Sequence, residues 1–113
     1  MDCIFCKILN KEIPANFIYE DDNVVAFNDL NPQAPIHILI IPKQHISTIN
    51  EIDESNYDIS GKMILSAKKI ALQLGINEEG YRLVFNCNKN GGQEVFHIHL
   101  HLLGGRLFKW PPG

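Results

Sequence analysis

The sequence has no block of positive charge, few cysteines and no long hydrophobic run, and each of these absences excludes a class of protein. Its 113 residues carry a formal net charge of -3, and the ten lysines and arginines are scattered along the chain. A nucleic-acid partner is therefore not expected, because polyanions are recognised through clustered positive charge. No stretch approaches the roughly 18 apolar residues of a membrane span, and the acidic start is unlike a basic, apolar signal peptide. We expect a cytoplasmic protein without a membrane partner.

The three cysteines are odd in number, which argues against a disulfide framework. In a reducing compartment Cys3 and Cys6 are expected to be free thiols in a Cys-x-x-Cys pair, available to a metal or to redox chemistry. A thioredoxin-type redox site would follow a strand and open a long helix, and the N-terminal position of the pair disfavours it. Cys87 lies in a β-like run and is expected to be a small buried residue.

The length and the absence of repeats or linkers predict one domain over residues 1–113. The patterns predict a short helix over residues 4–9 and strands over residues 17–19, 24–29, 37–41, 81–87 and 97–103, the last two separated by a turn at 88–92. A capping box at Ser55 and Asp58 and a stop at Gly75 are expected to bound one long helix. Its apolar stripe is Ile59, Met63, Ile64, Ala67, Ile70, Ala71 and Leu74. One long helix on a five-stranded antiparallel sheet is an α+β fold.

Three histidines alternate with apolar residues in the last predicted strand, as His-Ile-His-Leu-His-Leu over residues 97–102. Period-two alternation puts three imidazoles on one face. If they were ordinary core histidines, each of the three rings would need its own hydrogen-bond partners on that one face. A single metal ion is also a poor fit, because His97 and His101 would lie about 13 Å apart at 3.3 Å per residue. The row suits a ligand with several anionic oxygens, one ring attacking while its neighbours donate hydrogen bonds.

This run matches the signature His-x-His-x-His-x-x with hydrophobic x, so the chain resembles the histidine triad (HIT) superfamily. Further similarity to its nucleotide-binding Hint branch covers nearly the whole chain: Cys-Ile-Phe-Cys-Lys-Ile at 3–8, Glu-Asp-Asp at 20–22, Asn-Pro-Gln-Ala-Pro at 31–35, Ile-Pro-Lys-x-His at 41–45, Gly-Gly-Gln at 91–93, Gly-Gly-Arg at 104–106 and the terminal Trp-Pro-Pro-Gly. The resemblance implies hydrolysis of purine nucleoside 5'-phosphoramidates through a covalent nucleotidyl-histidine. It also implies a homodimer that extends the sheet across a two-fold axis, with the helix and the edge from Tyr81 as candidate interface elements.

The same resemblance implies a role for each site residue. His99 would be the nucleophile, His101 and His37 would donate to phosphate oxygens, and His97 would orient the site. Glu94 would help to protonate the departing amine, the alternative being a solvated loop carboxylate. The nucleotide would be held by Asp29 at the ribose, by Asn86, Gly92 and Gln93 beside the phosphate and by Ile4, Phe5, Ile8, Ile13, Phe27 and Leu30 around the base.

In zinc-bearing relatives, two thiolates matching Cys3 and Cys6 combine with two histidines matching His45 and His97. Such a closed Cys2His2 set has no position for water, so the zinc would be structural. The alternative is a pair of buried thiols without a metal. Two other functions stay open beside the phosphoramidase: a nucleotide-binding regulatory or scaffold protein without relevant turnover, and a related nucleotidyl hydrolase or transferase.

Overall fold

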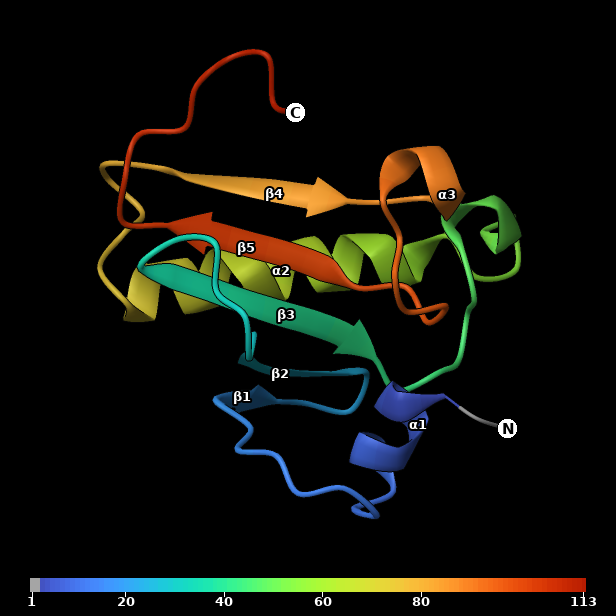
Figure 1. Ribbon diagram of the computed structural model, residues 1–113. Coiled ribbons are helices and arrows are strands. Elements are labelled where there is room, and N and C mark those ends of the chain that lie inside the picture. The colour runs from blue at the N-terminus through green and yellow to red at the C-terminus, as the bar shows by residue number, and fades with distance from the viewer. Residues whose placement is uncertain (1–2) are drawn as a thin grey trace.

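The computed structural model describes residues 3–113 and places the helices and strands as Figure 1 shows. The strands are β1 (Tyr19–Glu20), β2 (Val24–Asn28), β3 (Ile36–Pro42), β4 (Tyr81–Phe85) and β5 (Leu100–Gly104), and the helices are α1 (Ile4–Leu9), α2 (Asp58–Gln73) and α3 (Asn88–Gly91), with a 3-10 turn at Ile49–Glu51. The strands form one sheet in the order β1-β2-β3-β5-β4, and every neighbouring pair is antiparallel. The predicted α+β class with a five-stranded antiparallel sheet is confirmed.

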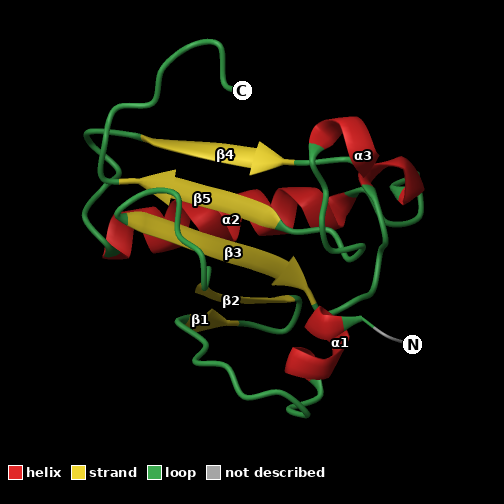
Figure 2. Cartoon of the chain, viewed as in Figure 1, coloured by secondary structure: helices red, strands yellow, loops and turns green. Residues whose placement is uncertain are grey.

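The two faces of the sheet carry different partners, because successive side chains in a strand point to opposite faces. Ile38 and Ile40 of β3 and Leu100 and Leu102 of β5 pack with the buried face of α2. Val25, Phe27, Leu39 and Ile41 pack instead with Phe5 and Ile8 of α1. The long helix therefore covers one face and α1 lies on the other, near the end of β3 (Figures 1 and 2). His37 and His101 alternate with residues that face α2, so both histidines belong to the α1 face.

Helix α2 ends where the sequence predicts but does not begin there. Ser55 donates both its N–H and its hydroxyl to the carboxylate of Asp53, and no side chain caps the helix at Tyr57, so the capping-box prediction is wrong. Gly75 follows the helix with a φ of 73°, the left-handed conformation that glycine adopts readily. Two members of the expected apolar stripe lie outside the core, since Ile64 is 47% and Leu74 45% exposed.

The last strand begins later than predicted, at Leu100, so His97 and His99 precede it. Pro42 ends β3 and has no N–H with which to continue the ladder to Ile98. The Ile98 N–H instead donates to the carbonyl of Ile46 over 2.7 Å. The histidine run is thus an extended segment that changes partner part-way, pairing first with the chain after β3 and then with β3 itself.

Two further boundaries differ from the sequence expectation. The residues predicted as a turn at 88–92 form the single helical turn α3 (Asn88–Gly91), which is followed by Gly92 with a φ of 80°. Strand β4 ends at Phe85, and Cys87 is the half-buried residue that precedes α3, so the prediction that Cys87 is a buried residue within a strand is wrong. Within the described range, no helix combines the length and apolarity needed to cross a membrane.

Candidate active site

Two histidines from neighbouring strands meet on the α1 face of the sheet. The antiparallel pairing of β3 with β5 places Leu103 opposite His37 and Leu39 opposite His101. The two rings lie diagonally across the strands, and Nε2 of His37 is 2.8 Å from Nδ1 of His101. The pairing of β3 with β5 thus brings the ring of His37 beside His101 of the triad.

A backbone amide fixes which nitrogen of each of these two rings carries the proton. The Gln33 N–H donates to Nδ1 of His37 over 3.0 Å, so a neutral His37 carries its proton on Nε2. That proton is donated to Nδ1 of His101, which leaves the His101 proton on Nε2. Burial lowers the pKa of His37, and burial together with the neighbouring histidines lowers the pKa of His101 to about 4. Both rings are neutral near pH 7, and His101 offers an N–H donor.

The ring of His99 is oriented by a carbonyl of its own segment. Its Nδ1 lies 2.9 Å from the carbonyl oxygen of His97, which can only accept, so Nδ1 holds the proton and Nε2 holds a free electron pair. Nε2 has no hydrogen-bond partner among residues 3–113. In the part of the chain that the structure describes, each side-chain nitrogen or oxygen that is shielded from solvent in a buried or half-buried residue does have a partner. This nitrogen is therefore accessible, even though the His99 side chain as a whole is mostly buried.

A cavity of about 260 Å³ opens where these rings meet. It is lined by Asp29, Asn31, Gln33, His37, Asn86, Gly92, Glu94, His99 and His101. The lining combines imidazole, amide and carboxylate groups with the backbone of a glycine. Such a polar, concave site suits a ligand that carries several oxygens.

Asp29 directly follows β2, and its N–H donates to the carbonyl of His37 at the start of β3; its carboxylate is only partly engaged by protein groups. Oδ1 accepts the Asn31 N–H over 2.8 Å, and Oδ2 lies 3.5 Å from Nε2 of His37. The side-chain donor atoms of Asp29, His37 and His101 lie within 4.8 Å of one another. Because Nε2 of His37 carries the proton that is donated to His101, it has no free electron pair for a metal, and the trio is not a ready metal-ligand set.

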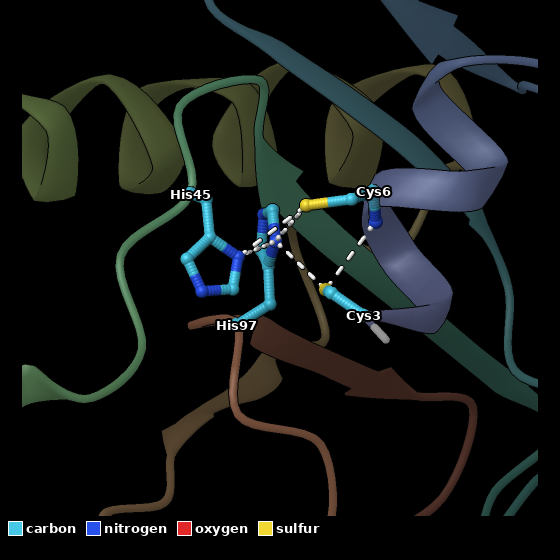
Figure 3. Close-up of side chains that lie close together, drawn as sticks. All are labelled: Cys3, Cys6, His45 and His97. Atoms are coloured by element: carbon cyan, nitrogen blue, oxygen red, sulfur yellow. Dashed lines mark hydrogen bonds between the residues drawn. The ribbon is translucent and has the colours of Figure 1, made fainter. Parts of the chain in front are cut away.

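A second cluster joins the N-terminal helix to the chain on both sides of the histidine run. Cys3 and Cys6 come from the start of α1, His45 follows β3, and His97 precedes β5; Figure 3 shows the four side chains pointing toward one another. Nδ1 of His97 lies 3.4 Å from Sγ of Cys3, 3.6 Å from Sγ of Cys6 and 3.1 Å from Nδ1 of His45. All four donor atoms lie within 4.8 Å of one another.

The chemistry of this cluster fits a tetrahedral metal such as zinc. With zinc bonds of about 2.3 Å to sulfur and about 2.0–2.1 Å to nitrogen, tetrahedral ligands lie roughly 3.3–3.8 Å apart, close to the separations found here. The other nitrogen of His97, Nε2, is 2.8 Å from the carbonyl of Pro42, so it carries the proton and Nδ1 is free to ligate. Burial and the hydrogen bond with Cys3 raise the pKa of the Cys6 thiol in the absence of a metal. The four residues can hold a metal ion.

Comparison with known proteins decides the family. The model of the HIT domain matches residues 10–108. The chain belongs to the HIT domain family. The purine nucleoside phosphoramidase of Escherichia coli (strain K12) is 55% identical to it over 93% of this chain and 88% of that protein. The predicted membership of the histidine triad superfamily is confirmed.

Solved HIT proteins share the whole arrangement of strands and helices. A HIT family hydrolase from Legionella pneumophila Philadelphia 1 superposes with a TM-score of 0.96 at 56% identity, over 99% of this chain and 100% of that one. A zinc-bound histidine triad family protein from Mycobacterium smegmatis superposes with a TM-score of 0.79 at 31% identity, over 94% of this chain and 76% of that one. The fold described here is therefore that of HIT hydrolases.

The residues predicted around a base are divided between the core and the surface of the HIT domain. Phe5, Ile8 and Phe27 belong to the buried cluster between α1 and the sheet, and Ile13 packs against it. Ile4 is 46% exposed and lines a neighbouring cleft with His45 and Glu94. Leu30 is fully exposed, and it belongs neither to that cluster nor to the lining of the three main cavities. Their role as a base pocket stays a prediction.

Two cavity residues of this HIT domain were missed at the level of sequence. Asn31 and Gln33 line the cavity, and the Gln33 N–H sets the tautomer of His37. Their signal was the Asn-Pro-Gln-Ala-Pro motif, which served as evidence of the family resemblance without a role being assigned to its residues. Gln93 is the reverse case, because it was predicted to contact the nucleotide but does not line the cavity.

Proposed function

We propose that this HIT protein hydrolyses purine nucleoside 5'-phosphoramidates, with His99 as the nucleophile. The observation that carries the proposal is the hydrogen bond from Nδ1 of His99 to the carbonyl of His97, which leaves the electron pair of Nε2 accessible. A neutral imidazole attacks well near pH 7 and also leaves well, because its ordinary pKa is about 6.5. The identity with the Escherichia coli phosphoramidase supports the choice of substrate.

In the first step Nε2 of His99 forms a bond to the α-phosphorus while the phosphorus–nitrogen bond breaks. Charge that builds on the non-bridging oxygens is met by the Nε2–H of His101, which His37 holds in the donating tautomer through its own Nε2–H. In the second step water attacks phosphorus and the bond to His99 breaks. This releases the nucleoside monophosphate and restores the neutral imidazole.

The departing amine needs a proton, since expulsion of an amide anion is prohibitively costly. Glu94 is exposed and lines both the histidine cavity and the neighbouring cleft, so its carboxyl group can reach a leaving group that passes between them. We assign to Glu94 the delivery of this proton, and its carboxylate takes a proton back from the attacking water in the second step, which restores the carboxyl group. Asn86 and Gly92, which line the same cavity, would hold the phosphate.

The nucleoside would lie between the phosphate cavity and α1. Asp29 has acceptor capacity left over after its bond to Asn31, which is enough for two ribose hydroxyls. The apolar surface near Phe5, Ile8, Ile13 and Phe27, with Ile4 and Leu30 exposed beside it, would take the purine. This division leaves the polar groups for the phosphate and the apolar groups for the base.

We infer that Cys3, Cys6, His45 and His97 hold a structural zinc. Four protein donors complete a tetrahedral set, so the ion would tie α1 to the histidine segment without activating water. The zinc-bound relative from Mycobacterium smegmatis supports this assignment. Free thiols in the described chain also agree with a cytoplasmic location, where cysteines stay reduced.

We also infer a homodimer that pairs the outer edge of β4. That strand ends the sheet, and an unpaired edge invites pairing with a second chain. Helix α2, which precedes β4 in the chain, has exposed apolar residues that would add to the contact: Ile64, Leu65 and Leu72. Sedimentation at micromolar concentration should give the mass of two chains, and a monomer would contradict the inference.

The function is tested with adenosine 5'-phosphoramidate and the wild-type protein beside His99→Ala. Wild type should release AMP and ammonia, and the variant should lose at least about 10³-fold in kcat, as expected for removal of a nucleophile. AMP binding should change far less. Binding without turnover in the wild type would instead favour the nucleotide-binding scaffold, and turnover by His99→Ala would require another nucleophile.

A further inference from the structure

Gln93 is a buried amide in the middle of an exposed polar loop. Its neighbours Gly92 and Glu94 are exposed and line the histidine cavity, whereas Gln93 itself is only 7% exposed. Its side chain therefore points into the protein while the residues on either side face the cavity. Burying an amide in this way is costly unless all of its polar atoms are bonded.

The structure supplies those bonds entirely from backbone groups. Oε1 of Gln93 accepts the N–H of Asn88 over 2.9 Å, and Nε2 donates to the carbonyls of Ser47 over 2.8 Å and Val95 over 3.0 Å. Both amide hydrogens are used, so the side chain has no donor left for a phosphate oxygen. The sequence-level prediction that Gln93 contacts the nucleotide is thus unsupported for its side chain.

The three bonds join segments that are distant in the sequence. Asn88 begins α3, Ser47 lies between β3 and α2, and Val95 leads into the histidine run. The segment of Ser47 and the segment that leads into the histidine run are joined a second time, because the Ile98 N–H donates to the carbonyl of Ile46. Gln93 is thereby the link that attaches the loop carrying Gly92 and Glu94 to this pair of segments.

We propose that Gln93 is a positioning residue that holds the loop of residues 92–94 against the reacting phosphoryl group without touching it. The proposal rests on the phosphoramidase function proposed above. Gly92 and Glu94 act at the phosphate and the leaving amine, and their positions follow from where Gln93 fixes the chain between them. A displacement of about 1 Å in such a loop costs up to about 10²-fold in rate.

The test compares Gln93→Met with wild type, because methionine keeps a similar length and removes every polar atom. Gln73→Met is the matched control, since Gln73 is exposed at the end of α2. We expect kcat for adenosine 5'-phosphoramidate to fall 10- to 100-fold in Gln93→Met while the Kd for AMP changes less than threefold. The control should match wild type in both measurements.

Each other result overturns the proposal. Unchanged kcat in folded Gln93→Met would show that the side chain only stabilises the fold. Loss of AMP affinity by the same factor as kcat/KM would show direct contact with the nucleotide. If the wild type itself has no turnover, the proposed phosphoramidase function is wrong. This result is distinguished from a failure of the Gln93 proposal because it is seen in the wild type alone, without any variant.

Amide hydrogen exchange in the wild type supplies a second measurement that does not depend on a variant folding. The Asn88 N–H belongs to an exposed residue, yet its bond to Gln93 should slow its exchange at least 100-fold relative to the amide of the exposed neighbour Lys89. Equal, fast exchange at the two positions would show that the link to Asn88 does not persist in solution, and would overturn the proposal.

Discussion

The ring of Phe5 stands edge-on to the ring of His99, with centroids 5.2 Å apart, and in the same way to the ring of His97 at 5.8 Å. Phe5 lies on α1 between Cys3 and Cys6, the two thiols of the Cys2His2 cluster. The helix that presents the thiols thus also packs against the proposed nucleophile. This contact connects the stability of the N-terminal segment with the shape of the site.

Loss of Cys6, a ligand of the proposed zinc, should lower stability. We expect Cys6→Ser, purified without chelators or a histidine tag, to lose its zinc and to melt at least about 5 °C below wild type, which corresponds to roughly 1 kcal/mol for a domain of this size. Cys87→Ser is the control, because Cys87 lies outside the cluster. Metal analysis and thermal melting check this, and a wild type with no zinc would end the structural-metal proposal.

Stability should fall as the pH is lowered from about 6.5 toward 4. His101 has its pKa lowered to about 4, chiefly by burial, so in this range the unfolded chain takes up a proton that the folded chain refuses. Burial acts in the same direction on His37. Urea unfolding of metal-free Cys6→Ser should therefore have a lower midpoint at pH 5 than at pH 7.5.

The comparison for this pH effect is Cys6→Ser with His101→Gln added. Glutamine does not titrate, so the drop between the two pH values should become smaller. Use of the metal-free background removes the separate effect of acid on metal binding. An identical drop in both proteins would assign the acid sensitivity to other groups.

Asp29→Asn should weaken nucleotide binding more than folding. The amide keeps an oxygen that can accept the Asn31 N–H but loses the charge and one acceptor needed for two ribose hydroxyls. We expect AMP to bind about tenfold more weakly, which equals about 1.4 kcal/mol, with little change in the urea midpoint. The exposed Asp22→Asn is the control. A parallel loss of binding and stability would favour a structural role.

Two glycine substitutions should have opposite effects on stability. Gly61 lies on the exposed side of α2 with nothing within 4 Å of an added Cβ, so Gly61→Ala should stabilise by about 0.5–1 kcal/mol. Gly105 has a φ of 91°, and an added Cβ would lie 2.8 Å from Cβ of Pro35. Gly105→Ala should destabilise by about 1–3 kcal/mol. Urea unfolding checks both, and equal midpoints would contradict the geometric argument.

Sequence patterns predicted the fold well where side-chain periodicity governs the structure. The apolar run that includes Ile38 and Leu39 and the helical spacing of Met63 and Ile70 identify a central strand and the core side of the long helix, and each of these residues is buried as expected. The start of the last strand was predicted wrongly because it depends on a distant residue, Pro42, which cannot continue the ladder. Such a boundary is set by the partner strand and is absent from the local pattern.

The site was predicted in part for a similar reason. Residue type and the family resemblance pointed to His37, His99 and His101, which line one cavity. The tautomer of His37 depends on the backbone N–H of Gln33, and the Gln93 amide is consumed by backbone groups. Backbone donors and acceptors are the same for every residue type except proline, so sequence letters carry little information about these bonds.

The orientation of His99 is supplied by the main chain of His97, while the side chain of His97 serves the thiol cluster. Replacement of residue 97 by another amino acid would remove a donor of the proposed metal site but would leave a carbonyl in the chain at that place. The two tasks of this one position can therefore diverge during evolution. A lineage could abandon the metal and retain an aligned nucleophile.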